Sequence, residues 1–400
     1  MIAYYAIGDL IPLYPVYALL FSDHGLSAGA ISSLFTLWSL TAFVLEVPSG
    51  AWADVVSRRG LLAVSSLLLA LGFATWIVFP SYAGFALGFV LWGASGALMS
   101  GTFQALLYDE LSAFGAAAGY PRIMGFANSG SMLANLVATA LAAPLMSVGG
   151  YALVGWLSVA VALVQLALAL SLPRAPRVAE ADETEVASPE GGLVRRYFSM
   201  LRDGLRESGA TPTIRHAVLI SALLYSFLVY DEYFPLVARE NGAPATQVPL
   251  LIALTVAGQA LGTVTAGRTA KLGGRVLALA LSVAAAVLAA GALTGDVGGF
   301  VAIALGYGAL NNVMIVSEAR LQESITGAAR ATVTSVSGLL SEVFALLLFA
   351  SFAIGSGFAQ VKTIVALLTI PLLVVAFLVA RWLPRPLPQK RDPSSLRQSR

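Results

Sequence analysis

The chain has little of what soluble enzymes use to build their sites. Only 11% of its 400 residues are charged, none is cysteine, and its two histidines are His24 and His216. The absence of cysteine excludes disulfides, thiolate metal sites and a cysteine nucleophile. Two histidines are too few for a histidine-rich metal site, so we expect neither a metal nor a cofactor. A net charge of +2 is too small to indicate a nucleic-acid partner.

Long apolar runs are what the chain has in abundance. Hydrophobic residues make up 58% of it, against about 45–50% in a soluble domain. Crossing about 30 Å of hydrocarbon takes about 20 apolar residues, and this window gives twelve candidate spans. Because backbone groups in lipid must be satisfied within the segment, and the runs are too long for barrel strands, we predict an all-α polytopic membrane protein. The expected spans are 2–21, 30–47, 61–79, 82–108, 123–146, 151–172, 217–238, 248–267, 276–294, 297–316, 331–352 and 364–382.

Arginine and lysine residues gather on one set of alternate loops. Only Arg239 and Lys362 fall on the other set. By the positive-inside rule this places both termini and the loop 173–212 in the cytoplasm, and we expect a bacterial inner membrane. The apolar start carries no basic n-region, so we interpret it as a first span rather than a signal peptide. The bases on the cytoplasmic loops are Arg58, Arg59, Arg122, those between 174 and 215, Arg268, Lys271, Arg275, Arg320, Arg330 and those from Arg381 onward.

The long loop divides the spans six and six. It begins with an acidic stretch and continues with a basic one, in which Leu or Tyr recurs every four residues from Leu193 to Leu205. That pattern is typical of an amphipathic helix lying on anionic headgroups. We therefore divide the chain into an N-terminal six-helix bundle (1–172), a cytoplasmic linker (173–212), a C-terminal six-helix bundle (213–384) and a cytoplasmic tail (385–400).

The loop between the second and third spans carries a charged motif. Gly50, Asp54, Arg58 and Arg59 follow one another in the stretch VPSGAWADVVSRRG at 47–60. Their spacing resembles the signature Gly-x-x-x-Asp-Arg/Lys-x-Gly-Arg-Arg/Lys of the major facilitator superfamily, with four of the six positions matching.

The two halves repeat the same charges at the same spacing. Glu110 precedes Arg122 by twelve positions, and Glu318 precedes Arg330 by twelve. Such an echo is typical of parallel repeats about an axis along the membrane normal. Together with the twelve spans and the long central loop, it extends the resemblance over almost the whole chain, which implies two pseudo-symmetric six-helix bundles. The chain resembles the bacterial drug:proton antiporters of the family, although their glycine-proline signature in the fifth span is spaced differently here.

The resemblance also implies roles for the cytoplasmic charges. In the family, acid and base pairs bridge the halves while the outside is open and part when the inside opens, as rigid-body rocking allows. Static surface charges, each worth about 0–1 kcal/mol, are the alternative. The residues that would form this gate and loop motif are Gly50, Asp54, Arg58, Arg59, Asp109, Glu110, Arg122, Glu318 and Arg330.

Acidic residues inside the spans are the strongest indication of function. An Asp or Glu at mid-membrane costs about 2.5–3.5 kcal/mol on insertion scales, and no Lys or Arg shares the depth of these acids. Such carboxyl groups can exchange protons near neutral pH or hold a cation; a hydrogen-bonded packing role is the alternative. We expect Asp9, Asp231 and Glu232 to face the cavity that the family builds from spans one, four, seven and ten. We expect Glu342 to lie nearer the interface between the halves.

Polar and aromatic neighbours extend this expected cavity. Pro12 and Pro15 remove backbone hydrogen bonds next to Asp9 and should bend the first span. Interfacial aromatic belts and interhelical hydrogen bonds are the alternative roles of tyrosines and amides. The residues expected to line the cavity beside the acids are Tyr5, Gln104, Asn311 and Asn312.

We interpret the chain as a secondary transporter that moves a small organic molecule by proton-coupled alternating access. Acids without bases at their depth favour export of cationic or neutral amphipathic compounds. Proton-coupled uptake of a nutrient, facilitated diffusion and a non-transporting receptor or sensor are the alternatives. An ATP-driven pump and an intramembrane enzyme are disfavoured because the chain lacks the Gly-x-x-x-x-Gly-Lys-Ser/Thr, His-Glu-x-x-His and Gly-x-Ser-x-Gly motifs. The expected partners are the substrate, protons and the lipid bilayer, and we expect a monomer.

Overall fold

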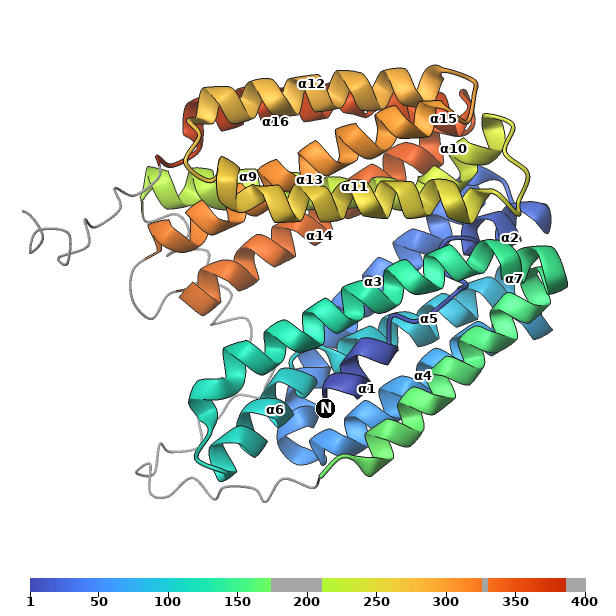
Figure 1. Ribbon diagram of the computed structural model, residues 1–400, viewed down its shortest axis with the longest axis vertical. Coiled ribbons are helices and arrows are strands. Elements are labelled where there is room, and N and C mark those ends of the chain that lie inside the picture. Colours follow the sequence, from blue (N-terminus) through green and yellow to red (C-terminus); the bar gives the residue numbers. More distant parts are fainter. Residues whose placement is uncertain (174–210, 326–329, 386–400) are drawn as a thin grey trace, which may run out of the picture.

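The computed structural model describes residues 1–173, 211–325 and 330–385, without the side chains of 47–55 and 330–332. In these ranges every regular element is a helix, so the all-α prediction is confirmed. The helices form two groups, α1–α7 and α9–α16 (Figure 1). The longer elements are α3 (Ala28–Val55), α4 (Arg58–Val78), α5 (Tyr82–Met99), α6 (Thr102–Ala113), α7 (Tyr120–Ser171), α9 (Pro212–Ser226), α11 (Val248–Thr269), α12 (Gly274–Leu293), α13 (Gly299–Ser324), α14 (Arg330–Gly355) and α16 (Thr369–Trp382). The shorter ones are α1 (Ile2–Ile7), α2 (Tyr17–Asp23), η1 (Ala117–Gly119), η2 (Phe227–Tyr233), α10 (Phe234–Glu240) and α15 (Val361–Leu367).

The described residues contain ten segments long and apolar enough to cross a membrane, where the sequence predicts twelve. One of the ten contains two expected spans, because α7 runs through both and turns sharply at Gly150. Gly150 has φ 57°, a backbone conformation that glycine adopts without the Cβ strain of other residues. The remaining difference is the first expected span, which is not a continuous helix.

The first span is interrupted around Asp9. Helix α1 ends at Ile7 and α2 begins at Tyr17, with turns between them. Pro12 and Pro15 lie in this stretch and lack the backbone N–H that a helix needs. The freed amide of Leu13 donates instead to Ser158 Oγ on α7, at 3.1 Å. The expectation of a merely bent first helix was therefore wrong: the chain leaves the helix for about two turns.

The seventh span is interrupted in the same manner. Between α9 and α10, residues 227–233 form the 3₁₀ segment η2, which carries Asp231 and Glu232. The Tyr307 hydroxyl of α13 donates to the Leu228 carbonyl at 2.8 Å, and Tyr230 donates to Leu368 O at 2.5 Å. Broken helices persist at membrane depth where side chains satisfy the freed backbone groups in this way.

Close helix packing within the second group depends on small residues. Helices α11 and α13 make the most extensive contact in the molecule. A Cβ added to Gly258 would lie 2.3 Å from Ala304 O, and one added to Gly262 would lie 2.2 Å from Gly308 O. Only glycine therefore permits this approach, as in the small-residue interfaces common between membrane helices.

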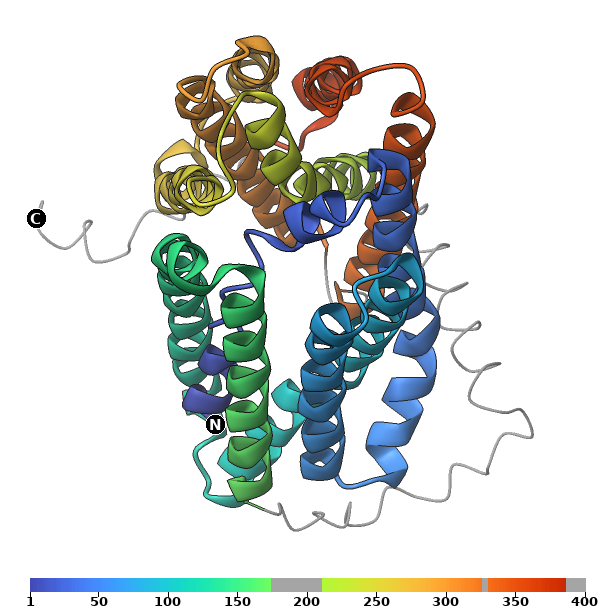
Figure 2. The same cartoon turned by 90° about the vertical axis from the view of Figure 1, so that its right-hand side faces the viewer.

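The two groups meet near one end of the molecule, which we call the Asp23 end. There α3 packs on α14, α7 on α11, and α2 on α10, and Figure 2, viewed toward this end, shows α3 beside α14. The Tyr233 hydroxyl and Ser32 Oγ form a hydrogen bond of 2.8 Å between the groups, and the Tyr233 ring stacks on Phe352. At the opposite end, which we call the linker end because α7 finishes and α9 begins there, the ribbons diverge (Figure 1).

Candidate functional site: an acidic and aromatic cavity between the helix groups

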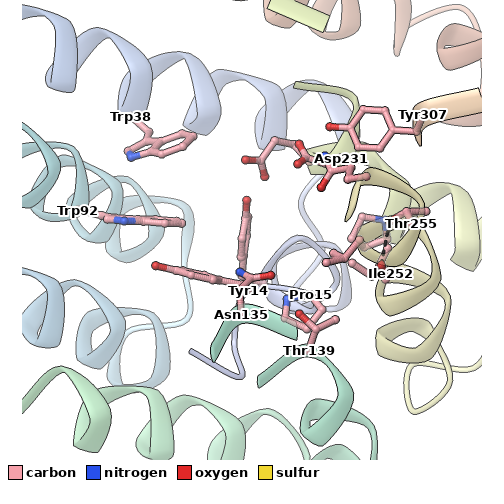
Figure 3. Close-up of a pocket in the computed structure, with 15 residues that line it drawn as sticks. Tyr14, Pro15, Trp38, Trp92, Asn135, Thr139, Asp231, Ile252, Thr255 and Tyr307 are labelled. Carbon is pink, nitrogen blue, oxygen red and sulfur yellow. Dashed lines mark hydrogen bonds between the residues drawn. The ribbon is translucent and has the colours of Figure 1, made fainter. Parts of the chain in front are cut away.

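A cavity of about 210 Å³ lies between the two groups of helices. Its walls differ in chemistry, as Figure 3 shows: Tyr14, Trp38 and Trp92 come from the first group, and Asp231 comes from η2 in the second. Glu232, next to Asp231, also lines it. The remaining lining residues are Pro15, Tyr17, Asn135, Thr139, Pro235, Ile252, Thr255, Val256, Gln259 and Tyr307.

A second cavity of about 280 Å³ lies beside the first. The two share Trp38, Asp231 and Glu232 as wall residues. On α14, Glu342 lines the second cavity and accepts a hydrogen bond of 2.7 Å from Ser39 of α3. Three of the four acids singled out from the sequence therefore line two cavities that share walls at the junction of the two groups.

The two neighbouring acids of η2 differ in their partners. The Asp231 carboxylate lies within reach of the Tyr307 hydroxyl and of backbone N–H groups of η2. Among the described residues no group forms a hydrogen bond or an ion pair with the Glu232 carboxylate. No arginine or lysine is among the described residues that line either cavity. The cavity walls thus carry acid groups without a basic counterpart.

Stacked aromatic rings form the wall opposite these acids. The Trp92 ring stacks on Tyr14, with centroids 5.3 Å apart and 10° between planes, and on Trp38, with centroids 4.9 Å apart and 29° between planes. We call Tyr14, Trp92 and Trp38 the aromatic column. Each is only partly buried and lines the first cavity. Behind them pack further rings, including Phe73 and Phe89.

Asp9 lies apart from this arrangement. Its carboxylate accepts a hydrogen bond from the Ser131 hydroxyl of α7, and it is not among the residues that line the two cavities. It nevertheless lies close enough to the Tyr14 hydroxyl to interact with it electrostatically, as does Glu232. Tyr14, which lines the first cavity, is thus under the electrostatic influence of Asp9.

The other polar residues expected at a cavity lie elsewhere. Tyr5 packs its ring on Phe103, 4.7 Å between centroids, and Gln104 on α6 has a buried Oε1 without a hydrogen-bond partner. Asn311 donates to Gln259 O and Thr263 Oγ1. Its neighbour Asn312 donates to Gly262 O and Thr265 Oγ1. Both asparagines therefore bind α13 to α11, the interhelical role that the sequence left open, and neither is among the residues lining the two cavities.

The charged loop motif lies at the linker end. Arg58 forms an ion pair with Asp109, which joins α4 to α6 inside one helix group. Arg59 donates to the Leu170 carbonyl at the end of α7. The side chains of Gly50 and Asp54 fall outside the described residues, although their backbone belongs to α3. The described part of the motif thus joins helices within the first group and does not bridge the two groups.

The described members of the repeated acid and base pairs, Glu110, Arg122 and Glu318, form no hydrogen bond or ion pair across the groups with other described residues. Glu110 is buried with its Oε1 unpaired, and Arg122 lies over the Phe126 ring, 5.7 Å from its centroid. Glu318 accepts hydrogen bonds from Ser221 at 2.6 Å and from Gln322 at 2.8 Å. The Arg330 side chain and the amphipathic segment at 193–205 lie outside the described residues.

An ion pair that the sequence reasoning missed bridges the groups at the Asp23 end. Arg239 on α10 contacts Asp23 Oδ1 of α2 at 2.5 Å, and Tyr151 donates to Asp23 Oδ2 at 2.6 Å. Arg239 was noticed only as an exception to the charge asymmetry. The available signal was that Arg239, one of the two bases on the base-poor side, shares that side with Asp23, which follows the first expected span.

The aromatic column was also missed, although the sequence held a sign of it. Tryptophans of membrane helices concentrate at the two interfaces, yet Trp92 falls in the middle of α5 and Trp38 well inside α3. Tryptophans at that depth, on spans other than those carrying acids, indicate a packed or ligand-facing aromatic site.

No grouping of three or more His, Cys, Asp or Glu side chains suited to a metal ion occurs in the described ranges.

Comparison with known proteins places this geometry in a family. A sequence profile described as Major Facilitator Superfamily matches residues 1–341, and no curated protein sequence matches the chain significantly. Nucleoside transporter NupG superposes with a TM-score of 0.71 at 13% identity, covering 95% of this chain and 98% of that one. The D-xylose-proton symporter gives 0.68 at 16%, covering 96% and 98%. A bacterial homologue of the iron transporter ferroportin in an inward-facing state gives 0.68 at 16%, covering 96% of each; at such identities the likeness is one of fold.

Proposed function

The chain belongs to the major facilitator superfamily, and we propose that it exports a small organic molecule in exchange for protons by alternating access. It is a multi-pass membrane transporter. Export, proton coupling and a bacterial inner membrane with both termini in the cytoplasm are the parts that we propose. The observation that carries the proposal is the position of the acidic cavity, which lies between the two helix groups and takes its walls from both.

Contacts between the groups support an alternating-access cycle. At the Asp23 end the Asp23–Arg239 ion pair and the Tyr233–Ser32 hydrogen bond join them. At the linker end the Arg58–Asp109 ion pair and the Ser221–Glu318 hydrogen bond each lie within one group. With the linker end in the cytoplasm, this arrangement suits an inward-facing state with the external side closed. Rocking the groups would part the Asp23–Arg239 pair and close the linker end.

Proton coupling is proposed from the carboxyl groups of the second helix group. Asp231, Glu232 and Glu342 border the cavities without a basic residue among the described walls. A carboxylate at membrane depth is costly, which is why such residues mark functional sites. Binding of a proton or of a cationic substrate neutralises the same negative charge. Competition between proton and substrate for these groups would couple their movements in opposite directions.

The proposal is tested in liposomes that contain the purified protein. A proton gradient is imposed, and movement of a panel of cationic and neutral amphiphiles is followed together with lumenal pH. Gradient-dependent flux with counter-movement of protons is the expected result. Movement of compound and protons in the same direction would replace export with symport, and flux indifferent to the gradient would indicate facilitated diffusion. Absence of flux across the panel, with binding retained, would favour a receptor or sensor.

A further inference from the structure

The first cavity offers two surfaces that attract the same kind of ligand. On one side the partly exposed rings of the aromatic column present faces with negative electrostatic potential. On the other side are the carboxyl groups of Asp231 and Glu232 (Figure 3). Each surface favours a positive charge, and between them lies the cavity of about 210 Å³.

We propose that this cavity binds organic cations with a flat aromatic or quaternary-ammonium head, which lies against the aromatic column while its charge faces Glu232. The inference rests on the proposed function in one respect, namely that the bound cation is the compound transported. It goes further in naming the substrate class and the two recognition elements. Neutral and anionic compounds are excluded as preferred ligands.

The partners of the two carboxyl groups assign them different roles. The Asp231 carboxylate already has the Tyr307 hydroxyl and backbone N–H groups of η2 beside it, whereas the Glu232 carboxylate has no hydrogen-bond or ion-pair partner among the described residues. A charged group shielded from bulk water without a partner is costly. A ligand cation supplies the missing partner, so Glu232 makes the direct contact and Asp231 adds to the negative potential.

The column explains why the cation should be organic rather than a metal ion. Rings provide no oxygen, nitrogen or sulfur ligands, and hard cations require several oxygen ligands. A cation with a delocalised or shielded charge loses little hydration on entering and gains from ring faces. Because the column belongs to α1–α7 and the acids to η2, the cation would contact both helix groups at once.

Binding is tested without any need for transport. Isothermal titration calorimetry on the detergent-solubilised protein compares N-methylquinolinium, a flat aromatic cation, with 4-methylquinoline, which has the same ring system and non-hydrogen atoms and is uncharged in mildly alkaline buffer. We expect the cation to bind at least about tenfold more tightly, because a close charge pair in a desolvated site contributes more than the ring contact alone. Equal affinity for the two compounds, or binding of neither, would overturn the proposal.

Variants separate the two recognition elements. Glu232→Gln should weaken binding of N-methylquinolinium at least about tenfold, and Trp38→Leu about 2- to 30-fold, the range expected for a lost cation–π contact. Trp38→Phe, which keeps a ring, should retain most of the affinity and remains informative if Trp38→Leu fails to fold. The matched controls are Asp296→Asn, in the turn before α13, and Trp382→Leu, whose ring stacks on His216 at 4.2 Å. Control variants that weaken binding as much as the site variants would contradict the assignment.

Flux of the same compounds distinguishes failure of this site from failure of the transporter proposal. If N-methylquinolinium binds with the expected variant pattern but does not cross protein-containing liposomes, the cation site stands and the export proposal fails. If neutral compounds cross in a gradient-dependent manner while the cation does not bind, the export proposal stands and the cation site fails.

Discussion

The two interrupted spans hold their acids in opposite ways. In the break between α1 and α2, Asp9 accepts a hydrogen bond from Ser131 and lines neither cavity. In the break between α9 and α10, Glu232 lacks such a partner and borders both cavities. In the sequence the two positions look alike, since each is an acid within an apolar span. In the structure they differ in whether a neighbouring helix supplies a hydrogen-bond donor. A nearby hydroxyl favours a packing role, and an open cavity favours a ligand-binding role.

The largest expected effect comes from removing the acids of η2. Asp231→Asn and Glu232→Gln keep the size of the side chains but cannot carry a negative charge, so proton exchange and cation attraction both end. We expect proton-coupled flux in liposomes to fall to the level of protein-free vesicles while the protein remains folded. Asp296→Asn serves as the control because it removes an exposed acid that lines neither cavity. Gradient-driven flux through both cavity variants at the wild-type rate would remove these acids from the mechanism.

A smaller effect is expected at Ser158, whose hydrogen bond stabilises the break between α1 and α2. The Ser158 hydroxyl accepts from the Leu13 amide at 3.1 Å and is fully buried. Ser158→Ala leaves that amide unpaired, which should lower the free energy of unfolding by about 1–3 kcal/mol. Denaturant titration in detergent measures the change. Ser171→Ala is the matched control, since that serine bonds within its own helix and is exposed; equal losses in the two variants would argue against a fastening role for Ser158.

The second break should be less sensitive to the same kind of change. Tyr307→Phe removes the bond from the phenol to the Leu228 carbonyl, for an expected loss of about 0.5–1.5 kcal/mol of unfolding free energy. The loss should be smaller than at Ser158 because a carbonyl at a cavity wall can accept from water. Tyr108→Phe, on an exposed tyrosine, is the control in the same titration. A loss larger than that of Ser158→Ala would reverse the ranking of the two breaks.

The sequence predicts the membrane depth of a residue better than it predicts the residue's partners on other helices. Membrane depth follows from hydropathy, so the spans and the acids inside them were predictable. Partners across the bundle were not, because whether Asp9 meets Ser131 or a cavity depends on how α1 and α7 rotate against each other. The aromatic column likewise joins three segments far apart in the chain. Asn311 illustrates the same limit, since depth alone does not tell a cavity wall from the α11–α13 interface.

The smallest expected effect, and the sharpest test of the comparison, is at Asp9. Sequence reasoning treats Asp9 and Asp231 alike, whereas the hydrogen bond from Ser131 favours a structural role for Asp9. Asp9→Asn keeps an oxygen that can accept this bond, so we expect gradient-driven flux close to that of the wild type under conditions where Asp231→Asn has none. Ser131→Ala should leave flux equally unaffected. If Asp9→Asn instead abolishes coupling while binding of N-methylquinolinium persists, Asp9 carries the proton. Tyr14, which interacts electrostatically with both Asp9 and Glu232, would then be the residue that couples the two interrupted spans.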